Sequence, residues 1–197
     1  MVRVGSYERI TKESRLQVAI DLDPGPVEIS TPVPFFSHML DQLGVHGRFG
    51  LRVEATGDWM VDAHHLVEDT GIALGTALRS ALGDRIGVER FADRVIPLDE
   101  SLVQVVLDVS GRGMACVQLQ GNRSVALGSP PVYIEHVEEF FAAFARHGGL
   151  TLHIRSLTEG NTHHQIEAAF KGLARVLNDA TRIVSDAVVS SKGLLDG

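Results

Sequence analysis

Apolar and polar positions along the first half of the chain alternate between a strand-like and a helix-like period. The strand-like stretches, rich in β-branched or apolar residues, lie near 3–10, 15–23, 27–31 and around Leu51, Val53 and Ala55. Apolar positions recur at helical spacing over 34–46, and a longer helix is expected from Asp62, a candidate N-cap, to Gly83. The pattern therefore predicts the order β-β-β-α-β-α.

The second half repeats this order. Strands are expected near 93–98, 101–109, 112–119 and 150–157, and helices over about 133–147 and from Thr162 to about Ile183. The His-Gly pair at 46–47 recurs 101 positions later at 147–148, and both pairs precede a strand. We therefore expect an α+β fold in a single domain, 1–197, made of two duplicated halves, about 1–90 and 91–190, with helices on one side of each sheet and a C-terminal tail at 190–197.

Each half also places the same histidine-containing motif at an expected helix start. The two copies are His64-His65-x-x-Glu68 and His163-His164-x-x-Glu167. Residues four apart share one face of a helix, so the first His and the Glu of each copy can bind one ion together. The second His of each copy points about 100° away and cannot easily join that ion from the same helix. The motifs therefore indicate two metal ions, each with ligands from both halves.

The surroundings of these motifs favour neutral imidazoles. Asp62 precedes the first copy, and Thr162 precedes the second and forms a capping-box pattern with Gln165. The positive end of the helix dipole disfavours protonated histidine there, and neutral imidazole is the form that binds a metal.

Further ligands follow from the repeat. His38 lies eight residues before the first His-Gly pair, and Glu139 lies eight residues before the second, so Glu139 is the expected partner of His38. His136 stands one helical turn earlier and remains the alternative. The single cysteine, Cys116, excludes a thiolate cluster, which leaves nitrogen and oxygen ligands suited to Mn, Fe, Co, Ni or Zn.

Composition and charge exclude several classes of protein. The chain has 44% hydrophobic and 22% charged residues, as is typical of globular proteins, and no stretch approaches the roughly 18 apolar residues of a membrane span. Its first residues do not match a secretory signal, which favours a cytoplasmic protein. A net charge of −7 argues against nucleic-acid binding, since neutralising phosphates requires a basic face. We expect no membrane or nucleic-acid partner.

Four basic residues are candidates for binding an anionic substrate: Arg90, Arg112, Lys171 and Lys192. Lys171 lies four residues after Glu167, on the helical face that also carries His163. A cation directed toward the metals suits an anionic substrate, and phosphate is the most common one.

With these residues in view, the chain resembles the imidazoleglycerol-phosphate dehydratase family over essentially its whole length. The segments that carry the resemblance include Arg9-Ile-Thr-Lys-Glu-Ser14, Pro34-Phe-Phe-Ser-His-Met-Leu40, His64-His-Leu-Val-Glu-Asp69, Pro97-Leu-Asp-Glu100, Asp108-Val-Ser-Gly-Arg112, Asn161-Thr-His-His164, Glu167-Ala-Ala-Phe-Lys171 and Ser190-Ser-Lys-Gly193. The resemblance implies a fold like domain 2 of ribosomal protein S5 and trimers that assemble into a 24-subunit shell. It also implies two Mn2+ ions per site at subunit interfaces, and the loss of water from imidazole glycerol phosphate, a phosphorylated imidazole, in histidine biosynthesis.

The same resemblance assigns residues to roles. It places metal ligands at His38, His64, His65, Glu68, Glu139, His163, His164 and Glu167. It places substrate contacts at Glu13, Arg90, Arg112, Lys171, Ser190 and Lys192. Glu13, Glu68 and Glu167 are the candidate catalytic carboxylates. The chain departs from the family pattern at Ser37, Leu66, Gly113, Ser191 and Glu139, where the family has Asp, Thr, Pro, Thr and His.

The chemistry of the implied reaction explains the need for metals. The hydrogen that is removed from the glycerol chain is not activated by a carbonyl, and Lewis acids on the ring nitrogens stabilise an imidazolate whose electrons can expel hydroxide. Two other functions remain open at this point: a binuclear metallohydrolase acting on a phosphate ester, and a metal-storing shell protein.

Overall fold

The computed structural model describes residues 3–57, 61–191 and 195 of the chain. In the first half the elements are β1 (Val4–Ile10), β2 (Ser14–Asp21), β3 (Val27–Ser30), α1 (Pro34–Gly47), β4 (Gly50–Gly57) and α2 (His64–Leu82). In the second half they are β5 (Phe91–Leu98), β6 (Ser101–Asp108), β7 (Met114–Gln118), α3 (Ile134–Gly148), β8 (Thr151–Ser156) and α4 (Thr162–Ala180). The order β-β-β-α-β-α therefore occurs in both halves, as predicted.

Each half forms a four-stranded mixed sheet with the same connectivity. The strand orders are β1-β2-β4-β3 and β5-β6-β8-β7. In each sheet the last two strands pair in parallel and the other neighbours are antiparallel. Two sheets with equal order and equal strand directions confirm the duplicated α+β fold.

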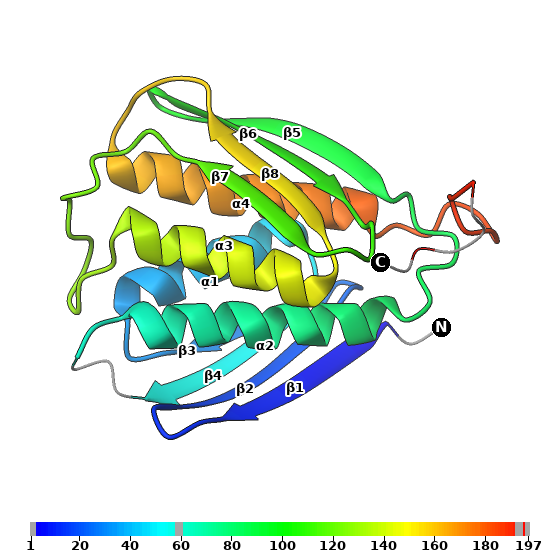
Figure 1. Cartoon of the computed structure of the whole chain (residues 1–197), viewed down its shortest axis with the longest axis horizontal. Helices are drawn as coiled ribbons and strands as arrows, with labels where there is room; N and C mark the ends of the chain where they lie inside the picture. Colours follow the sequence, from blue (N-terminus) through cyan, green and yellow to red (C-terminus); the bar gives the residue numbers. More distant parts are fainter. Residues whose placement is uncertain (1–2, 58–60, 192–194, 196–197) are drawn as a thin grey trace.

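The helices lie between the two sheets (Figure 1). Within the first half α2 packs on β1 and β2 and α1 on β3, and within the second half α4 packs on β5 and β6 and α3 on β7. Across the middle, α1 contacts α4 and α2 contacts α3. One face of each sheet is thus covered by helices, as expected, and the two halves share one core.

Phenylalanines from three helices fill the centre of that core. Phe140 of α3 is fully buried, stacks on Phe170 of α4 at a ring distance of 5.2 Å, and meets Phe36 of α1 edge-on at 5.5 Å. Burial of an aromatic ring is among the largest single contributions to stability. This cluster therefore ties α1 and α3 to α4, the helix that carries the second histidine motif.

Two predicted boundaries differ from the structure. Helix α4 ends at Ala180, not near Ile183, because the backbone beyond it pairs with the segment before β5: Val88 bridges Ile183, and Arg90 N–H donates to Ala180 O. Strand β7 begins at Met114, not at 112, because the preceding turn includes two glycines with φ of +86° and +76°. None of the helices in the described residues combines the length and apolarity that a bilayer crossing requires.

Candidate functional site

In both histidine motifs the backbone N–H of the first histidine donates to a side-chain oxygen two residues earlier. Asn161, the N-cap of α4, accepts a hydrogen bond from His163 N–H at 2.9 Å through Oδ1. In α2 the N-cap position is Ala63, and Asp62, one residue earlier, accepts from His64 N–H at 2.8 Å. The prediction of Asp62 as N-cap is therefore wrong by one position, although its carboxylate still binds the helix start.

The capping box expected from Thr162 and Gln165 is wrong. Gln165 is fully buried, and its Nε2 donates to Ser101 Oγ at 3.1 Å and to Thr158 O at 2.9 Å. Its Oε1 accepts a short hydrogen bond from Ser156 Oγ. The amide is thus fully engaged by Ser156 at the end of β8, by Thr158 in the loop that follows it and by Ser101 at the start of β6, and not by the start of its own helix.

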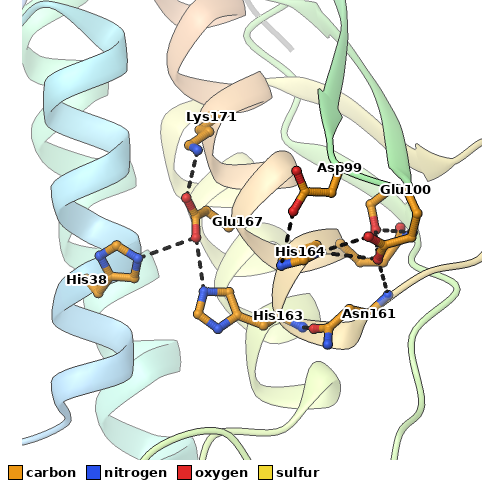
Figure 2. Close-up of polar contacts among 10 residues, drawn as sticks. His38, Asp99, Glu100, Asn161, His163, His164, Glu167 and Lys171 are labelled. Atoms are coloured by element: carbon orange, nitrogen blue, oxygen red, sulfur yellow. Dashed lines mark hydrogen bonds and ion pairs between the residues drawn. The ribbon is translucent and has the colours of Figure 1, made fainter.

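Helices α1 and α4 bring three possible metal ligands together. Glu167 Oε2 lies 3.4 Å from His38 Nε2 and 3.0 Å from His163 Nε2, and the three ligand atoms all lie within 4.8 Å of one another. Figure 2 shows the two imidazoles directed at this carboxylate from different helices. The contact between α1 and α4 therefore assembles the ligands that the repeat placed on separate segments.

Lys171 binds the other oxygen of the same carboxylate, with Nζ 2.7 Å from Glu167 Oε1 (Figure 2). Burial by itself raises the pKa of Glu167, but hydrogen bonds from Lys171 and His163 and the charges of Lys171 and His38 outweigh it and lower the pKa to about 2. Glu167 is therefore an anion at neutral pH, as a metal ligand has to be.

Helices α2 and α3 form the equivalent pair across the boundary between the two halves. His64 Nε2 lies 3.8 Å from Glu68 Oε2, and its ring meets the ring of His136 edge-on at 5.8 Å. Burial lowers the pKa of His136, which favours the neutral imidazole. Glu139 is exposed on the next turn of α3. His136 and Glu139 therefore both stay candidates for the ligand on α3.

The second histidine of each motif faces the turn of a β-hairpin instead. His65 Nδ1 lies 3.3 Å from Glu13 Oε2 in the β1–β2 turn, and His164 Nδ1 lies 3.1 Å from Glu100 Oε2 in the β5–β6 turn. Sequence reasoning gave no role to Glu100. The feature of the sequence that could have indicated Glu100 is the Glu-Ser pair that both turns contain, Glu13-Ser14 and Glu100-Ser101.

Two of the basic candidates, Arg90 and Arg112, form a separate group around Asp108. Arg90 Nε lies 2.8 Å from Asp108 Oδ1, and Arg112 Nη2 lies 3.6 Å from Asp108 Oδ2. Arg90 Nη1 also donates to Val189 O at 2.5 Å, which places Ser190 next to this group. Lys192 lies outside the described residues. Two arginines and the start of the tail therefore come together, as a site for an anion requires.

Within one chain this basic group lies far from the histidine pairs. Arg90 bonds the last residue of α4, Ala180, whereas His163 stands in its first turn, 17 residues earlier. At about 1.5 Å per residue the two ends of the helix are about 25 Å apart. Figure 1 shows the segment that follows α4, up to residue 191, and the starts of α2 and α4 at opposite ends of the molecule.

Comparison with known proteins agrees with this arrangement. Residues 31–177 match the family model described as imidazoleglycerol-phosphate dehydratase. The chain belongs to this family. An imidazoleglycerol-phosphate dehydratase of Methanopyrus kandleri is 44% identical over 98% of this chain and 97% of its own length, and one of Saccharolobus solfataricus is 46% identical over 99% of this chain and 100% of its own.

Solved structures of the dehydratase family have the same fold. The enzyme of Staphylococcus aureus has a TM-score of 0.82 and 35% identity, with 92% of this chain and 99% of that chain covered. The enzyme of Pyrococcus furiosus, in complex with (S)-C348, has a TM-score of 0.82 and 36% identity, with 96% and 100% covered. The resemblance seen in the sequence is confirmed, and the chain is a hydro-lyase.

The donor set of this dehydratase-family chain fits a divalent cation. The ligand atoms that converge are imidazole nitrogens and a carboxylate oxygen. The single cysteine of the chain, Cys116, is not among them. Ser37, where the family has Asp, shares a hydrogen bond of 2.8 Å with Thr31, so its hydroxyl is engaged beside His38. His38, His163 and Glu167 can therefore hold a metal at the α1–α4 contact.

Proposed function

We propose that the chain removes water from imidazole glycerol phosphate to give imidazole acetol phosphate, with two Mn2+ ions per site. The observation that supports this most directly is the convergence of His38, His163 and Glu167 beside Lys171 in a chain of the dehydratase family. We propose the ligand set His38, His64, His65, Glu68, Glu139, His163, His164 and Glu167. Bound to the imidazole nitrogens of the substrate, the metals supply Lewis acidity.

The protons are moved by the chain's own carboxylates. The reaction breaks the C–O bond on the carbon next to the ring and the C–H bond on the adjacent carbon, and the resulting enol becomes a ketone. Glu13 suits the shuttle because its side chain is 57% exposed and ends 3.3 Å from His65 Nδ1. Glu68 and Glu167 act chiefly as ligands, and the low pKa of Glu167 keeps it in the anionic form that binds a metal.

The phosphate is bound by Arg90, Arg112, Ser190, Lys192 and Lys171. The first two are already paired with Asp108, which orients their guanidinium groups. Because the basic group and the helix starts lie at opposite ends of one chain, a single copy cannot hold both ends of a small substrate. We therefore propose that the site forms between subunits, in trimers that assemble into a 24-subunit shell, in the cytoplasm, where histidine biosynthesis takes place.

Product analysis tests the function. Purified chain with Mn2+ and imidazole glycerol phosphate should release a ketone that keeps its phosphate, whereas free inorganic phosphate would identify a metallohydrolase. A metal-storing shell would give neither product and would not bind a phosphorylated imidazole. Glu13→Gln should reduce turnover about 10²–10⁴-fold while Mn2+ stays bound, and near-full turnover would exclude Glu13 as the proton shuttle.

A further inference from the structure

The β5–β6 turn holds His164 by two connected hydrogen bonds. Glu100 Oε2 lies 3.1 Å and Oε1 3.2 Å from His164 Nδ1, and Oε1 also accepts a hydrogen bond from Asn161 N–H at 2.6 Å (Figure 2). Asn161 is the N-cap of α4. The carboxylate of Glu100 therefore links the start of α4 to the imidazole of His164, and it fixes the imidazole relative to the helix start.

Buried contacts keep the turn itself in place. Ser101, next to Glu100, is 1% exposed and accepts a hydrogen bond from the fully buried Gln165 of α4. The β1–β2 turn is attached in the same manner, since Ser14 Oγ donates to the buried Asp69 of α2. The carboxylate of each turn is therefore presented to its histidine by a rigid backbone, which an accidental surface contact would lack.

The two turns occupy equivalent positions in the two halves, but the carboxylate of Glu100 makes more hydrogen bonds than that of Glu13. Glu13 makes its contact with His65 at 3.3 Å, and its backbone N–H donates to Thr11 Oγ1 in the same turn. The carboxylate of Glu100 is held in addition by the backbone of Asn161, whose N–H donates to Oε1 at 2.6 Å. Glu100 thus has a defined orientation, whereas Glu13 is placed to exchange protons.

A carboxylate accepts hydrogen bonds only, so the nitrogen that faces it carries the proton. His164 Nδ1 lies at hydrogen-bond distance from Glu100, whereas Nε2 is 4.0 Å from Asp99 Oδ2, beyond that distance. For a neutral His164 this places hydrogen on Nδ1 and leaves the lone pair on Nε2. Outer carboxylates of this kind set the tautomer and ring orientation of metal-binding histidines and raise their basicity.

We propose that Glu100 is a positioning residue, which holds His164 in the Nδ1–H tautomer and presents Nε2 to a metal ion. The proposal rests on the proposed function to the extent that His164 is a ligand. It assigns different tasks to the equivalent carboxylates of the two halves: Glu100 orients an imidazole, and Glu13 moves protons.

The test compares Glu100→Ala and Glu100→Gln with the wild-type assembly. Titration with Mn2+, followed by electron paramagnetic resonance, should show an affinity roughly 10–100-fold lower at one of the two ions for Glu100→Ala. Glu100→Gln keeps an oxygen for Asn161 N–H but loses the charge, and we expect a smaller loss. Glu159→Gln, which changes an exposed carboxylate in the loop before α4, is the matched control and should bind as wild type.

A second measurement reports on the tautomer directly. In metal-free protein with ¹⁵N-labelled histidine, the His164 nitrogens should show the Nδ1–H pattern in wild type and a mixture in Glu100→Ala. Unchanged Mn2+ affinity with an unchanged tautomer would overturn the proposal, as would an ion seated on Asp99, Glu100 and His164 themselves. Product analysis of the wild type is independent of both readouts, so a wrong function and a wrong role for Glu100 give different results.

Discussion

The contact between α2 and α3 depends on two glycines of α2, and adding a methyl group to either is a direct test of the helix packing. An ideal Cβ at Gly71 would lie 2.7 Å from Phe140 O, and one at Gly75 would lie 2.6 Å from Phe144 O and 2.9 Å from Gly148 N. All of these are backbone atoms of α3. No side-chain rotation relieves the overlap, so the helices have to separate.

The size of the effect follows from two opposing contributions. In an exposed helix, Gly→Ala stabilises by about 1 kcal/mol. The distances from the added Cβ to the backbone of α3 are well below the 3.4 Å at which ordinary contact begins. Each substitution should therefore lie near the upper end of the roughly 1–3 kcal/mol cost of overpacking. We therefore expect Gly71→Ala and Gly75→Ala each to destabilise by about 2 kcal/mol. The double variant should cost less than the sum, because one separation of the helices accommodates both methyl groups.

Urea denaturation of the three variants measures these changes in the free energy of unfolding. In thermal unfolding, each 1 kcal/mol of destabilisation should lower Tm by about 2–4 °C. Ser80→Ala, at an exposed position of the same helix, is the control and should not destabilise. Since His64 and Glu68 lie on α2, the separation should also weaken Mn2+ binding. A Gly71→Ala variant about 1 kcal/mol more stable than wild type would refute the close approach of the two helices.

Three further predictions concern single side chains. Phe140→Ala should lower the free energy of unfolding by about 3–5 kcal/mol in urea titrations, because the ring is fully buried among other rings, and a loss below 1 kcal/mol would contradict that packing. Lys171→Met should raise the pKa of Glu167 in the metal-free protein, measured by ¹³C NMR of the carboxylate, and should raise KM for the phosphorylated substrate. The pKa values of Glu100 and Glu167, lowered from 4.5 to about 2, mean that both carboxylates stabilise the fold above pH 4.5 and that this stabilisation is lost as the pH falls toward 2. Acid titration followed by circular dichroism checks this, and Glu100→Gln should reduce the dependence on pH.

Local patterns were sufficient to predict the elements and their order. Hydrophobic periodicity and turn residues act over a few neighbouring positions, so they give the β-β-β-α-β-α order twice and place a histidine pair at the start of each long helix. The repeat matched His38 with Glu139 but did not indicate which histidine motif His38 meets, and the structure brings His38 to Glu167 across the α1–α4 contact. Sequence also predicted that the second histidine of each pair points away from the first.

The partners of those histidines were decided by long-range packing. Glu100 reaches His164, 64 residues away, because β5 and β6 pair and α4 packs over them. Gln165 leaves its predicted capping role for the same reason, since buried groups of β8 and the turn satisfy its amide better than its own helix start can. Helix α4 ends early where a backbone segment 90 residues before it in the chain pairs with its last residue.

The sequence by itself therefore determined the elements, the duplication and the chemical types of the ligands, all of which depend on residue type and spacing along the chain. Tertiary structure alone decided which carboxylate faces which imidazole, and it placed the arginines at the far end of α4 from the histidine pairs. The physical reason is that a hydrogen bond or ion pair between distant segments requires a particular approach of two packed elements, and local propensities carry no information about that approach.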